Sequence, residues 1–158
     1  MDLKNNTMKN LTLALLLLFS LQTIAQTENP KYDKNLAEKL GGDDYGMKTY
    51  VFVILKTGSV KIDDKAKVNE LFTGHMANID KLAKEDKLVI AGPFYKNENN
   101  YRGLFIFNVK TLEEAEKLLS TDPAVSAQLL EAEMYKWYGS AALGEYLEVH
   151  EKIEKLKP

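Results

Sequence analysis

The sequence contains no cysteine, only two histidines and a single arginine among its 158 residues. Without cysteine, disulfide frameworks, cysteine-ligated zinc sites and thiol enzymes are excluded. Two histidines are too few for a three-histidine metal site, and no ligand spacing indicates a site of histidine with carboxylates. A G-x-S-x-G elbow, a Walker loop and a G-x-G-x-x-G turn after a strand are also absent, which excludes the commoner hydrolase, kinase and dinucleotide-binding classes. We therefore predict no metal and no cofactor.

The longest apolar stretch lies near the N-terminus, at residues 11–24, and follows two lysines. A basic start, a short apolar run and small residues before a cleavage point are typical of a secretory signal. We predict cleavage after Ala25, so that residues 1–25 are a signal peptide and the mature protein is periplasmic. An uncleaved anchor is the alternative, but a membrane span needs about 20 apolar residues. Met1 and Met8 are both possible starts, since the signal pattern is complete from either.

The charge balance of the predicted mature chain is acidic. Removing the signal leaves 19 basic and 22 acidic residues, a net charge of −3, with Arg102 as the only arginine. Nucleic-acid binders normally present a basic face with several arginines. No basic amphipathic helix indicates binding to a membrane surface either. We therefore expect neither a nucleic-acid partner nor a membrane partner after signal cleavage.

Strand-like and helix-like segments alternate after a polar tether at residues 26–46. Asp63 and Asp64 offer an N-cap to the first long helix, and Thr111 with Glu114 forms a capping box for the second. The predicted domain covers residues 47–142 and is followed by a C-terminal helix within residues 143–158. Its expected elements are strand 50–55, helix 65–84, strand 87–95, strand 103–109, a helix from 112, a short helix from 123 and strand 130–137.

The order of these elements, β-α-β-β-α-β, predicts an α+β fold of the ferredoxin-like type. In that topology the first and third strands are central, and here they are apolar on both faces. Helices cover only one face of such a sheet, so the second face would leave a large apolar patch exposed. We therefore predict that two sheets pack face to face in a homodimer, as a dimeric α+β barrel.

His75 is the strongest candidate for chemistry. The helical spacing that places Ile79 and Leu82 on the sheet side also turns His75 toward the sheet. A partly buried imidazole can exchange a proton with a substrate, and a carboxylate on one ring nitrogen would fix its tautomer. Asp122 is the candidate carboxylate, although Asp before Pro123 is also typical of a helix N-cap. The two roles are compatible if one oxygen caps the helix and the other faces His75; the alternative is a core histidine bonded to a backbone carbonyl.

Arg102, Glu131 and Glu133 have two interpretations each, and a fourth titratable residue, His150, has one. Arg102 could bind a substrate carboxylate through paired hydrogen bonds, or be a solvated charge of a hairpin. Glu131 and Glu133 share one face of the last strand, which lines a cleft or faces solvent. His150 lies among glutamates of the terminal helix and fits a surface histidine with helical ion pairs.

Several short motifs occur in an order that resembles the YCII-related (YciI-like) family, and in particular its exported branch. The resemblance covers residues 47–143. The motifs that carry it are His75 in the first helix, Leu-Val-Ile-Ala-Gly-Pro at 88–93, Tyr-Arg-Gly at 101–103, Thr-x-Glu-Glu-Ala at 111–115, Thr-Asp-Pro at 121–123 and Trp-Tyr-Gly-Ser-Ala-Ala-Leu at 137–143.

This resemblance implies a dimeric α+β barrel with an active site built on the pair His75 and Asp122, and with Gly92 and Pro93 shaping the pocket floor. Some members of the family are associated with dehalogenating or lactone-isomerising steps in aromatic degradation, in which a histidine acts as acid and base. We therefore predict lyase or isomerase chemistry on a small organic molecule, with Arg102 as a further binding residue. A binding module without catalysis and a purely structural dimer are the alternatives.

Overall fold

The structure is a computed structural model that describes residues 29–155. The predicted signal peptide lies outside the described residues and stays a prediction. The chain divides into a unit that ends at Asp33 and a compact unit that begins at Lys34, to which all the elements below belong. Within residues 29–155, no helix has the length and apolar character needed to cross a membrane.

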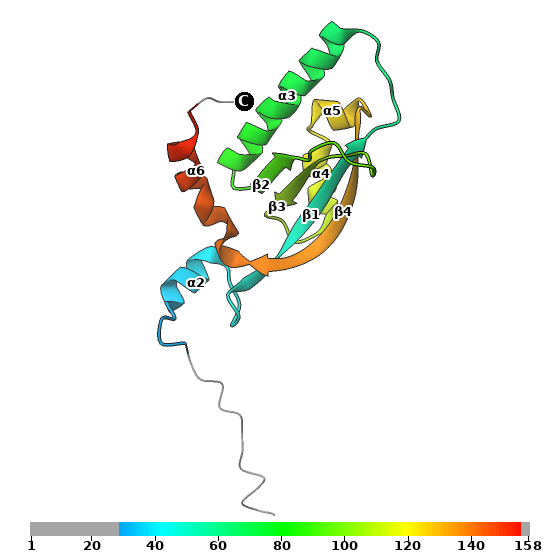
Figure 1. The fold of residues 1–158 in the computed structure, drawn as a ribbon. Coiled ribbons are helices and arrows are strands. Elements are labelled where there is room, and N and C mark those ends of the chain that lie inside the picture. Colours follow the sequence, from blue (N-terminus) through cyan, green and yellow to red (C-terminus); the bar gives the residue numbers. More distant parts are fainter. Residues whose placement is uncertain (1–28, 156–158) are drawn as a thin grey trace, which may run out of the picture. The chain divides into compact units, whose positions relative to one another are not determined.

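Four antiparallel strands form one sheet in the order β2-β3-β1-β4, so that β1 and β3 are central as predicted (Figure 1). This order and the interleaved helices confirm the α+β, ferredoxin-like fold. The elements are α2 (Lys34–Leu40), β1 (Met47–Thr57), α3 (Lys65–Lys84), β2 (Leu88–Pro93), β3 (Tyr101–Phe107), α4 (Leu112–Leu119), α5 (Pro123–Ser126), β4 (Leu130–Ser140), the 3₁₀ helix η1 (Ala141–Tyr146) and α6 (Leu147–Ile153).

The main core lies between one face of the sheet and the helices α3, α4 and α5. Alternate residues of β1 point into it because side chains alternate across a strand. From the helix side, the apolar stripes of α3 and α4 complete the same cluster. The buried members of the core are Val51, Val53, Leu55, Leu82, Leu88, Phe105, Phe107, Val109, Ala115, Leu119, Ala124 and Leu130.

The two long helices begin at the caps that the sequence predicts. The Asp64 side chain accepts hydrogen bonds from the backbone N–H groups of Ala66 and Lys67 at the start of α3. At the start of α4, the Thr111 hydroxyl accepts from the Glu114 N–H, while the Glu114 carboxylate accepts from the Thr111 N–H. Both caps satisfy N–H groups that have no partner within the helix.

The Glu114 cap is expected to make stability depend on pH in the acid range. Hydrogen bonds from the backbone N–H groups of Lys110 and Thr111 hold the pKa of Glu114 below its ordinary value of 4.5. A carboxyl whose pKa is lowered in the folded state stabilises the fold above its unfolded pKa, and this contribution is lost as pH falls through the folded pKa. The Tm difference between wild type and Glu114→Gln should therefore be largest near pH 7 and shrink toward pH 2. Glu116→Gln, an exposed position of the same helix, is the control; a Glu114→Gln difference that is the same at both pH values would contradict the prediction.

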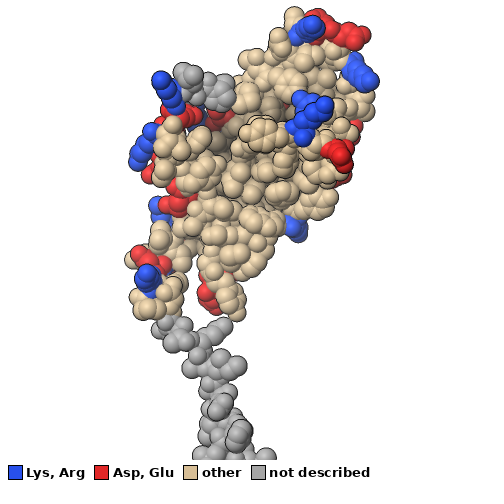
Figure 2. Space-filling model, viewed as in Figure 1, with Lys and Arg blue, Asp and Glu red and all other residues tan. Residues whose placement is uncertain are grey.

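The second face of the sheet is mostly apolar, with the Lys56–Glu133 ion pair among its charged residues, and it is only partly covered. Tyr50, Val89 and Ile106 are buried there, and Leu143 of η1 packs against this cluster. Trp137 on the same face keeps 38% of its surface exposed. Figure 2 shows uncharged residues over the strands in the middle of the view, with Lys, Arg, Asp and Glu mostly toward its edges. The face predicted to pack against a second sheet is therefore open to a partner.

The C-terminal region departs from the single helix expected from residue 143. It begins instead with the 3₁₀ helix η1, whose first turn is capped by the Ser140 side chain, and α6 starts only at Leu147. The η1 segment lies close against β2, since a Cβ built on Gly144 would lie 3.7 Å from Cγ1 of Val89. Glycine has low helix propensity, and a tighter 3₁₀ turn lets the chain follow the sheet before α6 begins.

Candidate functional site

A cleft of about 630 Å³ lies between α3, the edge strand β2 and the C-terminal elements η1 and α6. Its volume is in the range of small-molecule sites, roughly 300–1,000 Å³. Most of the lining is apolar and comes from α3, the sheet and the C-terminal segment; it includes Phe72, Ile79, Leu88, Ala91, Phe105 and Leu147.

The pair His75 and Asp122 forms a buried polar site at the wall of this cleft. Nδ1 of His75 lies 2.6 Å from Oδ2 of Asp122, and the two side chains are 11% and 1% exposed. His75 lines the cleft, whereas Asp122 lies behind it and is fully buried. The helical register predicted from the sequence therefore does turn His75 inward, onto a carboxylate that comes from 47 residues later in the chain.

Asp122 uses its two oxygens for different tasks. Oδ1 accepts hydrogen bonds from the backbone N–H groups of Ala124, at 2.9 Å, and Val125, at 3.3 Å, at the start of α5. Oδ2 faces His75. A carboxylate held by two backbone N–H groups has little freedom to rotate, so the cap of α5 fixes the position of the oxygen that meets the imidazole.

A close helix contact brings the pair together. A Cβ built on Gly74 would lie only 2.8 Å from Cγ of Pro123, closer than real side chains approach. Glycine at this position therefore allows the start of α5 to lie directly against α3, beside His75. The sequence analysis did not identify Gly74; its only signal was a glycine next to the candidate histidine in a helix otherwise free of glycine.

The ring of His75 is oriented from three sides. Phe105 stacks on it with ring centroids 5.8 Å apart and a 27° angle, and Phe72 meets it edge-on at 6.0 Å. Because an ionised carboxylate only accepts hydrogen bonds, Nδ1 carries the proton donated to Asp122. In the neutral ring, Nε2 is then the nitrogen with a lone pair, and it is the one left for a ligand in the cleft.

The predicted binding residues and the two glutamates of the last strand lie in different places. Gly92, Pro93 and Arg102 line the same cleft as His75. Glu133 instead pairs with Lys56 on the other face of the sheet, and this hydrogen bond holds the pKa of Glu133 below its ordinary value. Glu131 is exposed on the same strand. Among residues 29–155, no group of three His, Cys, Asp or Glu side chains could hold a metal ion.

The sequence analysis also missed the C-terminal wall of the cleft. Tyr146, Leu147 and His150 all line it. His150 was expected as a surface histidine with helical ion pairs; its side chain is 55% exposed and lies 3.8 Å from the carboxylate of Glu154. Its position in the cleft depends on how α6 returns to α3, a long-range contact that leaves no local pattern in the sequence.

Comparison with known proteins shows the family of this chain. One solved structure that this chain resembles is that of 5-chloro-2-hydroxyhydroquinone dehydrochlorinase from Burkholderia phenoliruptrix, in complex with 2,5-dihydroxybenzoquinone. The two chains are 17% identical with a TM-score of 0.41, and the match covers 55% of this chain and 92% of the other. A search of curated proteins finds no match. The model of the YCII-related domain matches residues 47–137, more than half of the sequence. The chain therefore belongs to the family of YCII-related domain proteins.

Proposed function

We propose that the protein is an enzyme that transfers protons on a small organic molecule, in a reaction of the lyase or isomerase type. The observation that carries the proposal is the buried hydrogen bond between His75 and Asp122 at the wall of a mostly apolar cleft. His75 is the general acid and base, and Asp122 is its positioning residue. Belonging to the YCII-related family supports the proposal, since the sequence resemblance implies the same pair.

The proposed reaction begins when Nε2 of neutral His75 removes a proton from a carbon next to a carbonyl group. The electron pair of the broken C–H bond moves into an enolate, and the imidazolium that forms is stabilised by the Asp122 carboxylate. Arg102 would pair with an anionic oxygen of the substrate. In an isomerisation His75 returns the proton to a different carbon. In an elimination the electron pair of the enolate forms a C=C bond and expels a leaving group from the neighbouring carbon, and His75 passes its proton to the leaving group or to water.

The test is hydrogen exchange in heavy water with a panel of cyclic enones, unsaturated lactones and hydroxyquinols. We expect wild-type protein to speed deuterium incorporation at one carbon of at least one compound, and His75→Ala to lose that activity. An active His75→Ala variant would refute the proposal. If the protein is a binding module instead, a compound will stabilise wild type and His75→Ala alike and be recovered without deuterium.

We also propose that the partly covered sheet face packs against a second copy of the chain. The half-buried side chains of Phe52, Ile90 and Leu104 on this face support it, because a patch of this kind drives association. Light scattering at micromolar concentration should give twice the chain mass, and Trp137→Glu should shift the protein toward the monomer. Lys136→Glu, on the opposite face of the same strand, is the matched control. A monomeric wild type, or equal effects of the two substitutions, would count against this interface.

A further inference from the structure

The cleft has two chemically different ends. After α3 the chain turns and β2 runs back along the helix, with the Lys87 N–H donating to the Leu82 carbonyl at the turn. The end of β2 at Pro93 therefore lies on the His75 side, together with Arg102, and the start of β2 lies near Lys84. His75 and Lys84 are nine residues apart in one helix, which corresponds to about 13 Å. A ligand that reaches both ends must be elongated.

The free edge of β2 forms the middle of the cleft. All six residues of this edge strand line it, which means that the strand presents its edge and not only one face. Phe94 donates its N–H to the Arg102 carbonyl of β3, and in an antiparallel ladder every second residue bonds in this way. The N–H and C=O of Ala91 therefore point away from β3 and toward the cleft. Pro93, which has no N–H to donate, lies on this same free edge.

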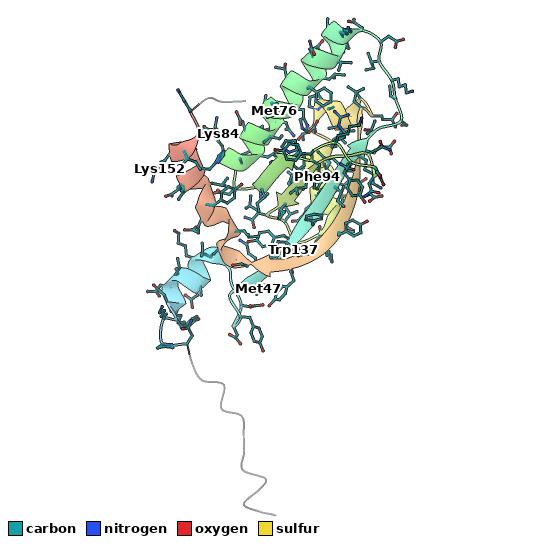
Figure 3. The ribbon with its side chains drawn as sticks, in the orientation of Figure 1. Met47, Met76, Lys84, Phe94, Trp137 and Lys152 are labelled. Carbon is teal, nitrogen blue, oxygen red and sulfur yellow. The ribbon has the colours of Figure 1, made fainter. Side chains whose placement is uncertain are left out.

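The outer wall at the Lys84 end is one continuous face of the C-terminal segment. The lining residues Leu147, His150 and Glu151 are spaced as i, i+3 and i+4, so they share one side of α6, and Glu154 follows directly as the C-cap residue of this helix. Val149, on another side of this helix, is 56% exposed and does not line the cleft. Figure 3 shows Lys84 extending from the end of α3 toward α6.

The charges at this end select the chemistry of what binds there. Three carboxylates line this end, from Asp80, Glu151 and Glu154, together with the ammonium group of Lys84 and the imidazole of His150. An excess of carboxylates repels an anionic group but accepts hydrogen bonds from a neutral hydroxyl. At the opposite end, Arg102 and the His75 pair favour an anionic or ionisable oxygen. The two ends therefore suit different groups of one molecule.

We infer that η1 and α6 select the substrate, and that His150 hydrogen-bonds a neutral hydroxyl group at the end of the ligand that lies farthest from His75. The substrate class is an elongated, mostly apolar molecule with an ionisable oxygen at one end and a hydroxyl at the other. This inference rests on the proposed function for the identity of the reacting end. The selecting wall, residues 141–153, follows the matched domain at 47–137 and so is an addition to it.

Calorimetric binding of three probes tests the inference: hydroquinone, 4-hydroxybiphenyl and 4,4′-dihydroxybiphenyl. Wild type should bind 4,4′-dihydroxybiphenyl most tightly, because it alone joins the required length to a second hydroxyl. His150→Ala should weaken this compound about fivefold to tenfold, the effect of one lost hydrogen bond, and leave 4-hydroxybiphenyl unchanged. Val149→Ala, a change on the solvent side of α6, should alter neither.

Other binding results would contradict the inference. If His150→Ala weakens both biphenyls equally or neither, or if hydroquinone binds as tightly as the longer probes, the inference is wrong. Binding is measured without turnover, so the result is separate from the proposed function. If His150→Ala does not distinguish the two biphenyls while the wild-type protein does exchange deuterium, only the role of α6 is overturned. Discrimination by His150 in a protein without exchange activity overturns only the proposed reaction.

Discussion

Asp122→Ala is expected to lower the free energy of unfolding by about 2–4 kcal/mol, because a buried donor left without its acceptor costs about 1–3 kcal/mol and a lost helix cap costs about 1 kcal/mol. The substitution leaves the His75 imidazole without its hydrogen-bond acceptor and the N–H groups of Ala124 and Val125 without a cap. At 1% exposure, water cannot replace the missing carboxylate without a rearrangement of α5. Urea denaturation followed by circular dichroism measures the loss.

Asp64→Ala is the matched control for this prediction. Asp64 caps α3 through the same type of bond to two backbone N–H groups, but it is exposed and has no histidine partner. Loss of such a cap costs about 1 kcal/mol. If Asp122→Ala and Asp64→Ala prove equally destabilising, Asp122 acts as a cap alone and the pair with His75 contributes nothing to stability. Asp122→Asn should lie between the two, since asparagine also caps helices well.

The features of the fold that the sequence predicts are those coded by neighbouring residues. The capping box at Thr111, the cap at Asp64 and the inward register of His75 all depend on residues within one or two helical turns. Strand order follows from the sequence of elements, because few connections satisfy β-α-β-β-α-β. The double use of Asp122 is one of the possibilities that the sequence leaves open, since an Asp before a proline marks a helix start and its second oxygen is then left for another partner.

The features that the sequence does not predict depend on contacts between distant segments. The sequence around Gly74 does not indicate that α5 packs against this glycine, where a built Cβ would lie 2.8 Å from Cγ of Pro123. The spacing of Leu147 and His150 is amphipathic, but the pattern does not say which surface the apolar side covers. That surface is the cleft beside β2. β2 is the edge strand of the described sheet because it pairs with β3 alone, and this depends on how distant strands pair. Local patterns thus locate His75 and Asp122 but not the walls of the cleft that His75 lines.

His75→Ala is expected to lower kcat by about 10²- to 10⁴-fold on any substrate found by deuterium exchange, the usual contribution of a general acid and base. KM should change little, because Phe72, Phe105 and the edge of β2 still form the apolar walls. Added imidazole should restore part of the rate by entering the space that the ring leaves. A variant that retains wild-type turnover, or a loss that appears only in KM, would show that His75 is a binding residue or a core residue.

Asp122→Asn separates positioning from catalysis at the same site. Asparagine keeps the cap of α5 and the shape of the residue, but it removes the negative charge that stabilises the imidazolium. Its amide can also turn its NH₂ group toward Nδ1, which would place the proton of His75 on Nε2, where it blocks proton abstraction. We therefore expect a smaller fall in kcat than in His75→Ala, with KM unchanged and no rescue by imidazole. A normal kcat would mean that the pair, although buried and well formed, serves the packing of α3 against α5 and not the reaction.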